Sequence, residues 1–213
     1  RMAGAAGVGI KVIGRGGHGS RPDMSVNPVF CAASILTNTA TAWVNQITAG
    51  RTVTLGVTSI QGGEAPNVIP DTADILGSLR FFNDEEGEKA VRIFKNVAEH
   101  TAAMNNCQVQ FDDRFCVLCA PVINDEYYSN LISAALPEVL LENVTVSSCE
   151  PWYASESFSC YRRICPSVLA HLGINNPSYG SGAAHHNGFF DVDEGVLSTG
   201  VIATLKFVAM LQK

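Results

Sequence analysis

Three short segments place polar side chains among residues that favour turns. Residues 14–22 read GRGGHGSRP and hold His18, Asn67 opens the segment Asn-Val-Ile-Pro, and His185 and His186 begin a loop ending at Asp191. Because glycine lets the backbone approach a ligand closely, His18 can reach a substrate carbonyl. There it can donate a hydrogen bond to the oxyanion that forms when water attacks an amide. A turn histidine that is merely exposed is the alternative interpretation.

The sequence contains no cluster of Cys, His, Asp and Glu dense enough to hold a metal ion. Cys116 and Cys119 have CxxC spacing, but the second pair that completes a zinc ribbon does not follow. The residues therefore favour the substrate-binding and closing portion of a hydrolase. The portion that generates the nucleophile is not recognisable in the sequence.

Composition excludes several classes of protein. A hydrophobic fraction of 46% and a charged fraction of 16% are typical of a packed globular chain. The net charge of -6 argues against a nucleic-acid partner. No uninterrupted apolar run reaches the roughly 18 residues that span a bilayer, so no membrane partner is expected. Seven scattered cysteines suggest buried free thiols and a cytoplasmic location.

Residues 8–116 are expected to form one domain of α+β type. Apolar residues recur at every second position in the expected strands and at three- and four-residue steps in the helices. The elements are a strand at 8–13, a helix at 28–47, strands at 52–61 and 72–82, a helix capped by Asn83 or Asp84, and a strand at 107–115. This is the split βαβ order (βαββαβ) of a ferredoxin-like sandwich, in which two helices cover one face of an antiparallel sheet.

Residues 1–7 and 117–213 are expected to belong to a second domain, an incomplete α/β domain. Their predicted elements are helices at about 125–140, 155–165 and 193–211, with Ser155 as a cap, and short strands at 144–146 and 168–172. Two short strands are too few for a complete α/β domain. This part therefore resembles half of a sheet domain whose other strands come from elsewhere.

Taken together, the motifs resemble those of the metal-dependent M20 amidohydrolases and peptidases. The similarity is greatest to the branch of N-acyl-amino-acid amidohydrolases that includes hippurate hydrolases. It is carried by residues 14–22, 67–71, 79–81, 155–158, 172–173 and 186–194. The resemblance implies a catalytic α/β domain interrupted by a ferredoxin-like lid, which often mediates dimerisation. Residues 8–116 are similar to that lid, and residues 117–213 to the last part of the catalytic domain.

The resemblance also implies roles for individual residues. His18 corresponds to a lid histidine that donates to the oxyanion, often in the partner subunit's site. Asn67 becomes a second polar contact to substrate, and Arg80 a clamp on the substrate carboxylate, for which its guanidinium fork is suited. A loop-capping amide for Asn67 and an ion pair on the open face of the sheet for Arg80 remain the alternatives.

His186 is the one metal ligand that the resemblance carries over to this chain. His185 is a rival ligand, because it occupies a position that is usually not histidine in the family, and Gly188 stands where the family usually has proline. Glu156 is followed by Ser157 where the family prefers aspartate, and it is expected to support the metal loop. Two divalent ions, zinc or manganese, would activate a water for attack on an N-acyl amino acid or small peptide. Most of their ligands are not in this chain, so these 213 residues alone are expected to be inactive.

Three interpretations therefore remain open. The chain is part of a hydrolase that acts as a homodimer through the lid. Alternatively, it is a non-enzymatic dimerisation or ligand-binding module derived from a truncated hydrolase, in which helix 28–47 and edge strand 52–61 pair two copies. In the third, the 213 residues are a portion of a longer polypeptide.

Overall fold

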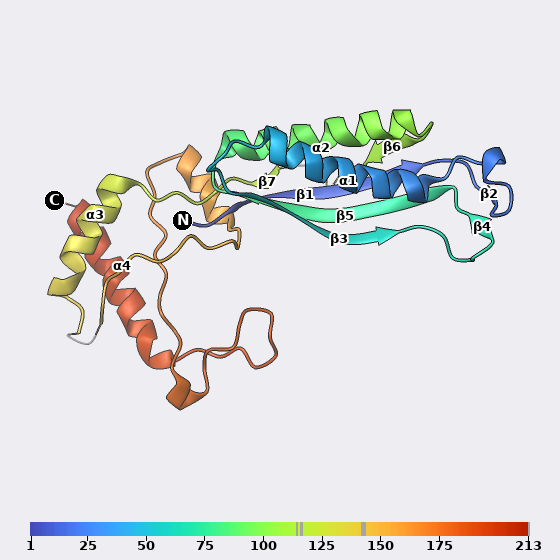
Figure 1. Ribbon diagram of the computed structural model, residues 1–213. Helices are drawn as coiled ribbons and strands as arrows, with labels where there is room; N and C mark the ends of the chain where they lie inside the picture. Colours follow the sequence, from blue (N-terminus) through green and yellow to red (C-terminus); the bar gives the residue numbers. More distant parts are fainter. Residues whose placement is uncertain (114, 116, 142–143, 213) are drawn as a thin grey trace. The chain divides into compact units, whose positions relative to one another are not determined.

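The computed structural model describes residues 1–113, 115, 117–141 and 144–212 (Figure 1). The chain divides into two compact units. The first contains Arg1–Val122 and Pro151–Arg163, and the second contains Ile123–Glu150 and Ile164–Lys213. The first unit therefore extends beyond the predicted lid boundaries of 8 and 116, because the flanking segments pair with its sheet.

The first unit is a sheet covered on one face by two helices, as Figure 1 shows. The strand order is β3-β5-β1-β6, every neighbouring pair is antiparallel, and β7 pairs with the start of β1. The elements are β1 (Gly4–Ile13), α1 (Pro28–Gln46), β3 (Val53–Gln61), β5 (Thr72–Phe81), α2 (Asp84–Met104), β6 (Gln108–Phe111) and β7 (Val117–Cys119). This arrangement confirms the predicted split βαβ sandwich.

The two central strands supply the core of this unit. β1 and β5 pair along ten residues each, from Gly4 opposite Phe81 to Ile13 opposite Thr72. Every second side chain of β5 is directed toward the helices, so that Ile75 and Leu79 are fully buried there. Burial of this alternating face is what fixes the register, since a shift by one residue would exchange the two faces.

The helices begin where the sequence predicts. The Asn83 side chain accepts a hydrogen bond from the backbone N–H of Glu86 and so caps α2. α1 and α2 run antiparallel across the sheet. At one end the Thr48 hydroxyl donates to Glu86 at 2.5 Å, and further along Asn38 donates to Thr101 at 3.0 Å.

The thiols are only partly as predicted. Cys31 and Cys107 are buried in the core of the first unit, where burial and the neighbouring Cys107 thiol raise the pKa of Cys31 to about 12. The expectation of buried thiols is wrong for Cys149, Cys160 and Cys165, which are exposed. Cys116 lies outside the described residues, so the prediction for its pair with Cys119 stays a prediction.

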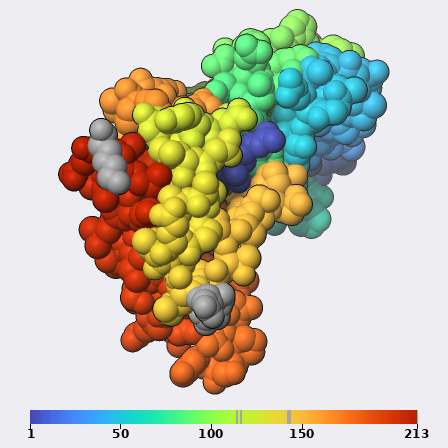
Figure 2. Space-filling view, turned by 90° about the vertical axis from the view of Figure 1, so that its left-hand side faces the viewer, coloured from blue at the N-terminus to red at the C-terminus, as the bar shows by residue number. Residues whose placement is uncertain are grey.

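The second unit contains few regular elements. They are α3 (Glu126–Ala135), α4 (Leu197–Leu211) and the short 3-10 helices Leu136–Glu138, Pro177–Tyr179 and Glu194–Val196. α3 lies along α4 (Figure 2), and the rings of Tyr128 and Phe207 meet edge to face at 6.2 Å. Lys206 forms an ion pair with Glu138 at 2.7 Å.

The predicted strands at 144–146 and 168–172 do not form. A strand needs a hydrogen-bonded neighbour, and the side chain of Asn124 takes that place at Leu169. It donates to the Leu169 carbonyl and accepts from the Leu169 N–H, both at 2.9 Å. The predicted cap at Ser155 is also wrong. The 3-10 helix Ser157–Arg163 belongs to the first unit, and Glu156 accepts from the Phe158 N–H.

α4 is apolar and only partly covered. Its residues include Leu197, Val201, Leu205 and Leu211, and none of its residues is buried. Glu194–Leu211 has a mean hydropathy of 1.5 and is by length and composition alone able to cross a membrane. The expectation above concerned only uninterrupted apolar runs, and Lys206 interrupts this one, so the segment was not expected to be long enough. The core helix of a soluble protein has the same composition.

Candidate functional site

A two-stranded arm at one end of the main sheet brings two of the predicted site residues together. β2 (Gly17–His18) pairs antiparallel with β4 (Val68–Ile69), so that His18 lies opposite Val68. The Gly19 N–H donates to the Asn67 carbonyl at 2.8 Å. His18 and Asn67 are both exposed; His18 ends β2, and Asn67 is the turn residue directly before β4.

His18 is held within a tight turn. Its Nδ1 accepts a hydrogen bond from the backbone N–H of Ser20 at 3.2 Å, and the Ser20 hydroxyl lies 2.8 Å from the same nitrogen. The His18 carbonyl accepts from the Arg21 N–H at 2.9 Å. The turn therefore fixes one edge of the ring and leaves Nε2 on the opposite edge.

The base of the arm is anchored by Asp71. The Asp71 carboxylate accepts from the Gly16 N–H at 2.7 Å, and its carbonyl accepts from the Gly14 N–H at 2.8 Å. Glycine is required at position 16, because a Cβ there would lie 2.8 Å from the Ile69 carbonyl oxygen. Residues 14–16 and Asp71, which are distant in sequence, are thereby joined by one side-chain bond and one backbone bond.

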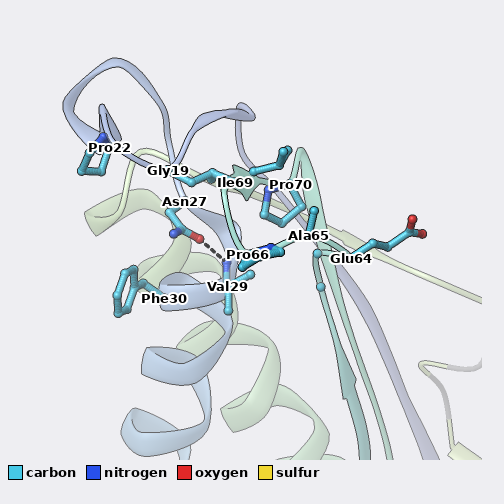
Figure 3. A pocket seen from close by; sticks show the side chains of 13 residues that line it. Gly19, Pro22, Asn27, Val29, Phe30, Glu64, Ala65, Pro66, Ile69 and Pro70 are labelled. Carbon is cyan, nitrogen blue, oxygen red and sulfur yellow. Dashed lines mark hydrogen bonds between the residues drawn. The ribbon is translucent and has the colours of Figure 1, made fainter.

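A hollow of about 580 Å³ lies beside the arm (Figure 3). Its walls come from the arm, the start of α1 and the loop at 62–66, and its lining is largely apolar. Figure 3 shows that Glu64 points away from the other lining side chains. Phe30, on α1, is 73% exposed, so the hollow is open to solvent.

Arg80 lies at the other end of the sheet. On β5 it is half-buried on the face opposite Leu79, and its guanidinium donates to the Leu79 carbonyl at 3.0 Å. Within the described ranges, no carboxylate forms an ion pair with it. Eight residue steps separate Arg80 from Thr72, or about 27 Å along a strand. Within one chain, Arg80 therefore does not meet the arm.

The paired histidines lie in an exposed loop of the second unit. His186 has a left-handed backbone with φ of 62°, which is uncommon for a residue other than glycine. The next residue, Asn187, accepts from the Phe189 N–H at 2.9 Å and closes a turn. The ring of His185 packs against that of Phe190, with centroids 5.2 Å apart. The two imidazoles are thus in different environments.

The sequence matches known proteins over almost its whole length. The family model described as a peptidase dimerisation domain, M20_dimer, matches residues 2–105. Thermostable carboxypeptidase 2 of Saccharolobus solfataricus is 28% identical over 198 residues, which are 91% of this chain and 48% of that protein. N-acetylcysteine deacetylase of Bacillus subtilis is 28% identical over 89% of this chain and 47% of its own length.

The chain belongs to the M20 family of peptidases and amidohydrolases. Its fold agrees with that of the Bacillus subtilis YXEP protein, a dinuclear metal binding peptidase from this family. The TM-score is 0.75 at 22% identity, over 99% of this chain and 50% of that one. The chain thus spans about half the length of the M20 relatives that it matches.

The metal chemistry associated with M20 proteins does not fit these residues by themselves. In the part of the chain that the structure describes, no three His, Cys, Asp or Glu side chains lie close enough to share a metal ion. A zinc site needs at least three protein ligands. His186 alone therefore cannot constitute such a centre, and no reaction step can be assigned to a metal from this chain.

Two residues of this M20 chain have local roles that the motifs did not reveal. Glu156 accepts hydrogen bonds from the Ser157 hydroxyl and the Phe158 N–H, and both lower the pKa of its carboxyl. Glu156 thus lies at the start of the 3-10 helix Ser157–Arg163. Ser20 contacts the His18 ring directly. Its position two residues after a turn histidine was the available sequence signal.

Proposed function

We propose that this chain is the lid and the last part of the catalytic domain of a metal-dependent amidohydrolase. Its substrates are N-acyl amino acids or small peptides, and its location is cytoplasmic. The observation that carries the proposal is the anchored arm, which presents His18 and Asn67 together at one end of an M20 lid. The names of the matched relatives, a carboxypeptidase and a deacetylase, support amide hydrolysis.

Each site residue has a role in this proposal. His18 donates to the carbonyl oxygen as it gains charge, which is where a hydrogen bond contributes most to catalysis. Asn67, beside it, supplies a second polar contact. Arg80 binds the substrate carboxylate. It is available for this role because, in the described part of the chain, no acidic side chain forms an ion pair with it. His186 is this chain's contribution to a zinc or manganese centre that the complete protein holds.

The separation of Arg80 from the arm supports a homodimeric site. Since about 27 Å of strand lies between them, no small substrate can contact Arg80 and His18 of one chain. A second copy can supply the other group. The edge strand β3 and the exposed side of α1 are the surfaces for this pairing.

The exposed apolar residues of α1 suit an antiparallel pairing. Phe30 is 73% exposed near the start of the helix, and Val44 is 86% exposed near its end. In a twofold interface, contact of Phe30 with Val44 of the second copy is repeated in reverse. The same symmetry brings the arm of one copy toward the Arg80 end of the other.

Subunit mixing tests the composite site. Residues 1–213 would be joined behind the part of the Bacillus subtilis N-acetylcysteine deacetylase that precedes its matched region. His18→Ala and Arg80→Ala homodimers should both lose hydrolysis of N-acyl amino acids. A random mixture should recover about one quarter of the unmutated activity, because half of the dimers are mixed and each has one intact site. If the mixture stays inactive while the unmutated chimera works, both groups belong to one chain and the proposal fails.

The chain by itself should hydrolyse negligible amounts of hippurate, even with added zinc. Robust turnover by the purified 213 residues would contradict the assignment of the remaining metal ligands to another part of the protein. Zinc uptake measured by mass spectrometry on the same sample gives an independent reading.

A non-enzymatic dimerisation or ligand-binding module is the second candidate. It is favoured by the match of residues 2–105 to a peptidase dimerisation domain. It predicts dimers in light scattering, no metal uptake, and no activity after the other half is supplied. Gain of metal binding and hydrolysis in the chimera would eliminate it.

A further inference from the structure

We propose that Ser20 is a positioning residue that fixes His18 as an Nε2–H hydrogen-bond donor, so that His18 acts on a carbonyl oxygen and not as a base. The inference rests on the proposed function for the identity of the acceptor. The assignment of the proton on the His18 ring rests only on contacts within this chain.

The backbone N–H of Ser20 decides the tautomer. An amide N–H can only donate, and it points to Nδ1 of His18 at 3.2 Å. Nδ1 is therefore unprotonated and accepts. A neutral imidazole carries one proton, so that proton is on Nε2.

The same bond assigns the contact of the Ser20 hydroxyl. Oγ lies 2.8 Å from Nδ1, a distance that either direction of donation would satisfy. Since Nδ1 is already an acceptor, the hydroxyl must donate to it. Backbone and side chain of Ser20 thus hold the same edge of the ring, and the Nε2–H edge is turned away from the turn.

This arrangement is the reverse of that in a histidine base. In a catalytic triad, a carboxylate accepts from Nδ1–H and leaves Nε2 with a free lone pair that takes a proton. The nearest acidic residue in this turn is Asp23, and Arg21 occupies both of its oxygens, at 3.0 and 2.8 Å. The Asp23 carboxylate is therefore bound by Arg21, and the Ser20 hydroxyl contacts Nδ1 of His18 where a carboxylate would lie in a triad.

The ligand that fits is a neutral or developing anionic oxygen, such as an amide carbonyl. The arm is exposed at His18 and Asn67, so such a group can approach Nε2–H from solvent. A hydrogen-bond donor of fixed direction requires no reorganisation when charge develops on the oxygen. A ligand that itself offers only donors is excluded.

The test is a long-range proton–nitrogen NMR spectrum of the 15N-labelled 213-residue chain, at a pH of about 8, where histidine is ordinarily neutral. His18 should show one tautomer, with Nδ1 unprotonated. Free histidine also favours the Nε2–H form, so the comparison with Ser20→Ala is decisive. That variant loses the hydroxyl bond but keeps the backbone N–H bond, so it should move His18 only part of the way toward the tautomer mixture of free histidine. Ser20→Thr, which keeps both groups, should give the wild-type spectrum.

Ser25→Ala is the matched control. Ser25 lies in the same loop, but its hydroxyl donates to the Pro22 carbonyl at 3.0 Å and it has no bond to His18. Its spectrum should show an unchanged His18. A protonated Nδ1 in the wild type, or an unaltered His18 in Ser20→Ala, would overturn the inference; the wild-type spectrum alone decides the tautomer if a variant does not fold.

Activity in the chimera gives the second reading. Ser20→Ala should lower kcat by about five-fold, the loss expected for one hydrogen bond, with KM unchanged. If the chimera has no hydrolase activity but the spectra are as expected, the proposed function fails and the assignment of Ser20 stands. If the chimera is active and Nδ1 of His18 is protonated, the proposed function stands and the assignment of Ser20 fails.

Discussion

α2 and α4 show what decides burial in this molecule. α2 carries a dense set of charged residues, yet seven of its residues are buried against the sheet of the first unit. α4 has a single charged residue, Lys206, and buries none. Apolar composition alone therefore does not produce a core; a facing surface does. The second unit has the residues for a core but lacks, among the described residues, the sheet that would cover them.

The same contrast holds for backbone pairing. β1 and β5 pair along ten residues, whereas the segment at Leu169 is held by one asparagine side chain. A contiguous apolar surface that is exposed, such as that of α4, marks an interaction site in soluble proteins.

The largest expected difference between the units is in the cost of truncating a leucine. Leu79→Ala should lower the free energy of unfolding of the first unit by about 2–5 kcal/mol, since Leu79 is fully buried. Leu205→Ala, at a residue 63% exposed on α4, should change stability by less than about 0.5 kcal/mol. Urea unfolding followed by tryptophan fluorescence measures the first unit, because both tryptophans, Trp43 and Trp152, lie there, and the loss of helical circular dichroism in urea reports on α4 as well.

Equal costs for the two leucines would contradict the comparison, since they would mean that α4 is covered in the isolated chain. Hydrogen exchange of the α4 amides checks the same point directly. These amides should exchange far faster than those of α2.

Glycine-to-alanine changes in the two helices should have opposite signs. A Cβ on Gly87 of α2 would lie 2.5 Å from the Phe81 ring, so Gly87→Ala should destabilise the first unit by about 1–3 kcal/mol. On Gly200 of α4 the nearest atom would be 3.4 Å away, in Leu172. Gly200→Ala should therefore stabilise α4 by up to about 1 kcal/mol through helix propensity. Circular dichroism melting of both variants decides the signs.

Loss of a helix cap should lower the free energy of unfolding in the first unit but not in the second, because, among the described residues, only the first has a core against which the helix packs. Asn83→Ala removes the bond to the Glu86 N–H and should lower the stability of the first unit by about 1 kcal/mol. Asp125 caps α3 in the same way, through the Tyr128 N–H at 3.0 Å. Asp125→Ala should speed hydrogen exchange at the start of α3 and leave the fluorescence transition in urea unchanged.

The smallest expected effect is a dependence on acid. Hydrogen bonds from Thr48 and the nearby Lys89 lower the pKa of Glu86. A lowered pKa in the folded state means that the stabilisation is complete above the ordinary glutamate pKa of about 4.3 and is lost as the pH falls through the lowered value. As the pH is lowered from about 6 to about 3, the urea midpoint should fall less in Glu86→Gln than in wild type. Glu85→Gln, which removes a charge from the same turn but keeps the Thr48 bond, should retain the wild-type slope.

Much of the first unit could be predicted from the sequence because its signals are local. The alternation in 72–82, the apolar face of 28–47 and the cap at Asn83 each point to the element that forms. The boundary of β1 could not be predicted. Its first residues are glycine and alanine, which have little strand preference, and they pair because β5 and β7 lie beside them.

The second unit and parts of the site were less predictable. Val168–Leu172 has a strand-like pattern, but a strand also depends on a neighbour that the segment does not show. The motif around His18 indicates a functional histidine, whereas its tautomer depends on a bond to Ser20 that only coordinates reveal. The distance between Arg80 and the arm follows from the length of β5, which the sequence did predict.

The shared length of β1 and β5 has a consequence for how this protein can change in evolution. Arg80 sits at one end of these strands and the histidine turn at the other, so their spacing is set by a count of paired residues. Inserting one residue in β5 would lengthen the strand by about 3.3 Å and turn Arg80 to the opposite face. A change in the length of the loops, by contrast, would leave the span between these two polar groups unaltered.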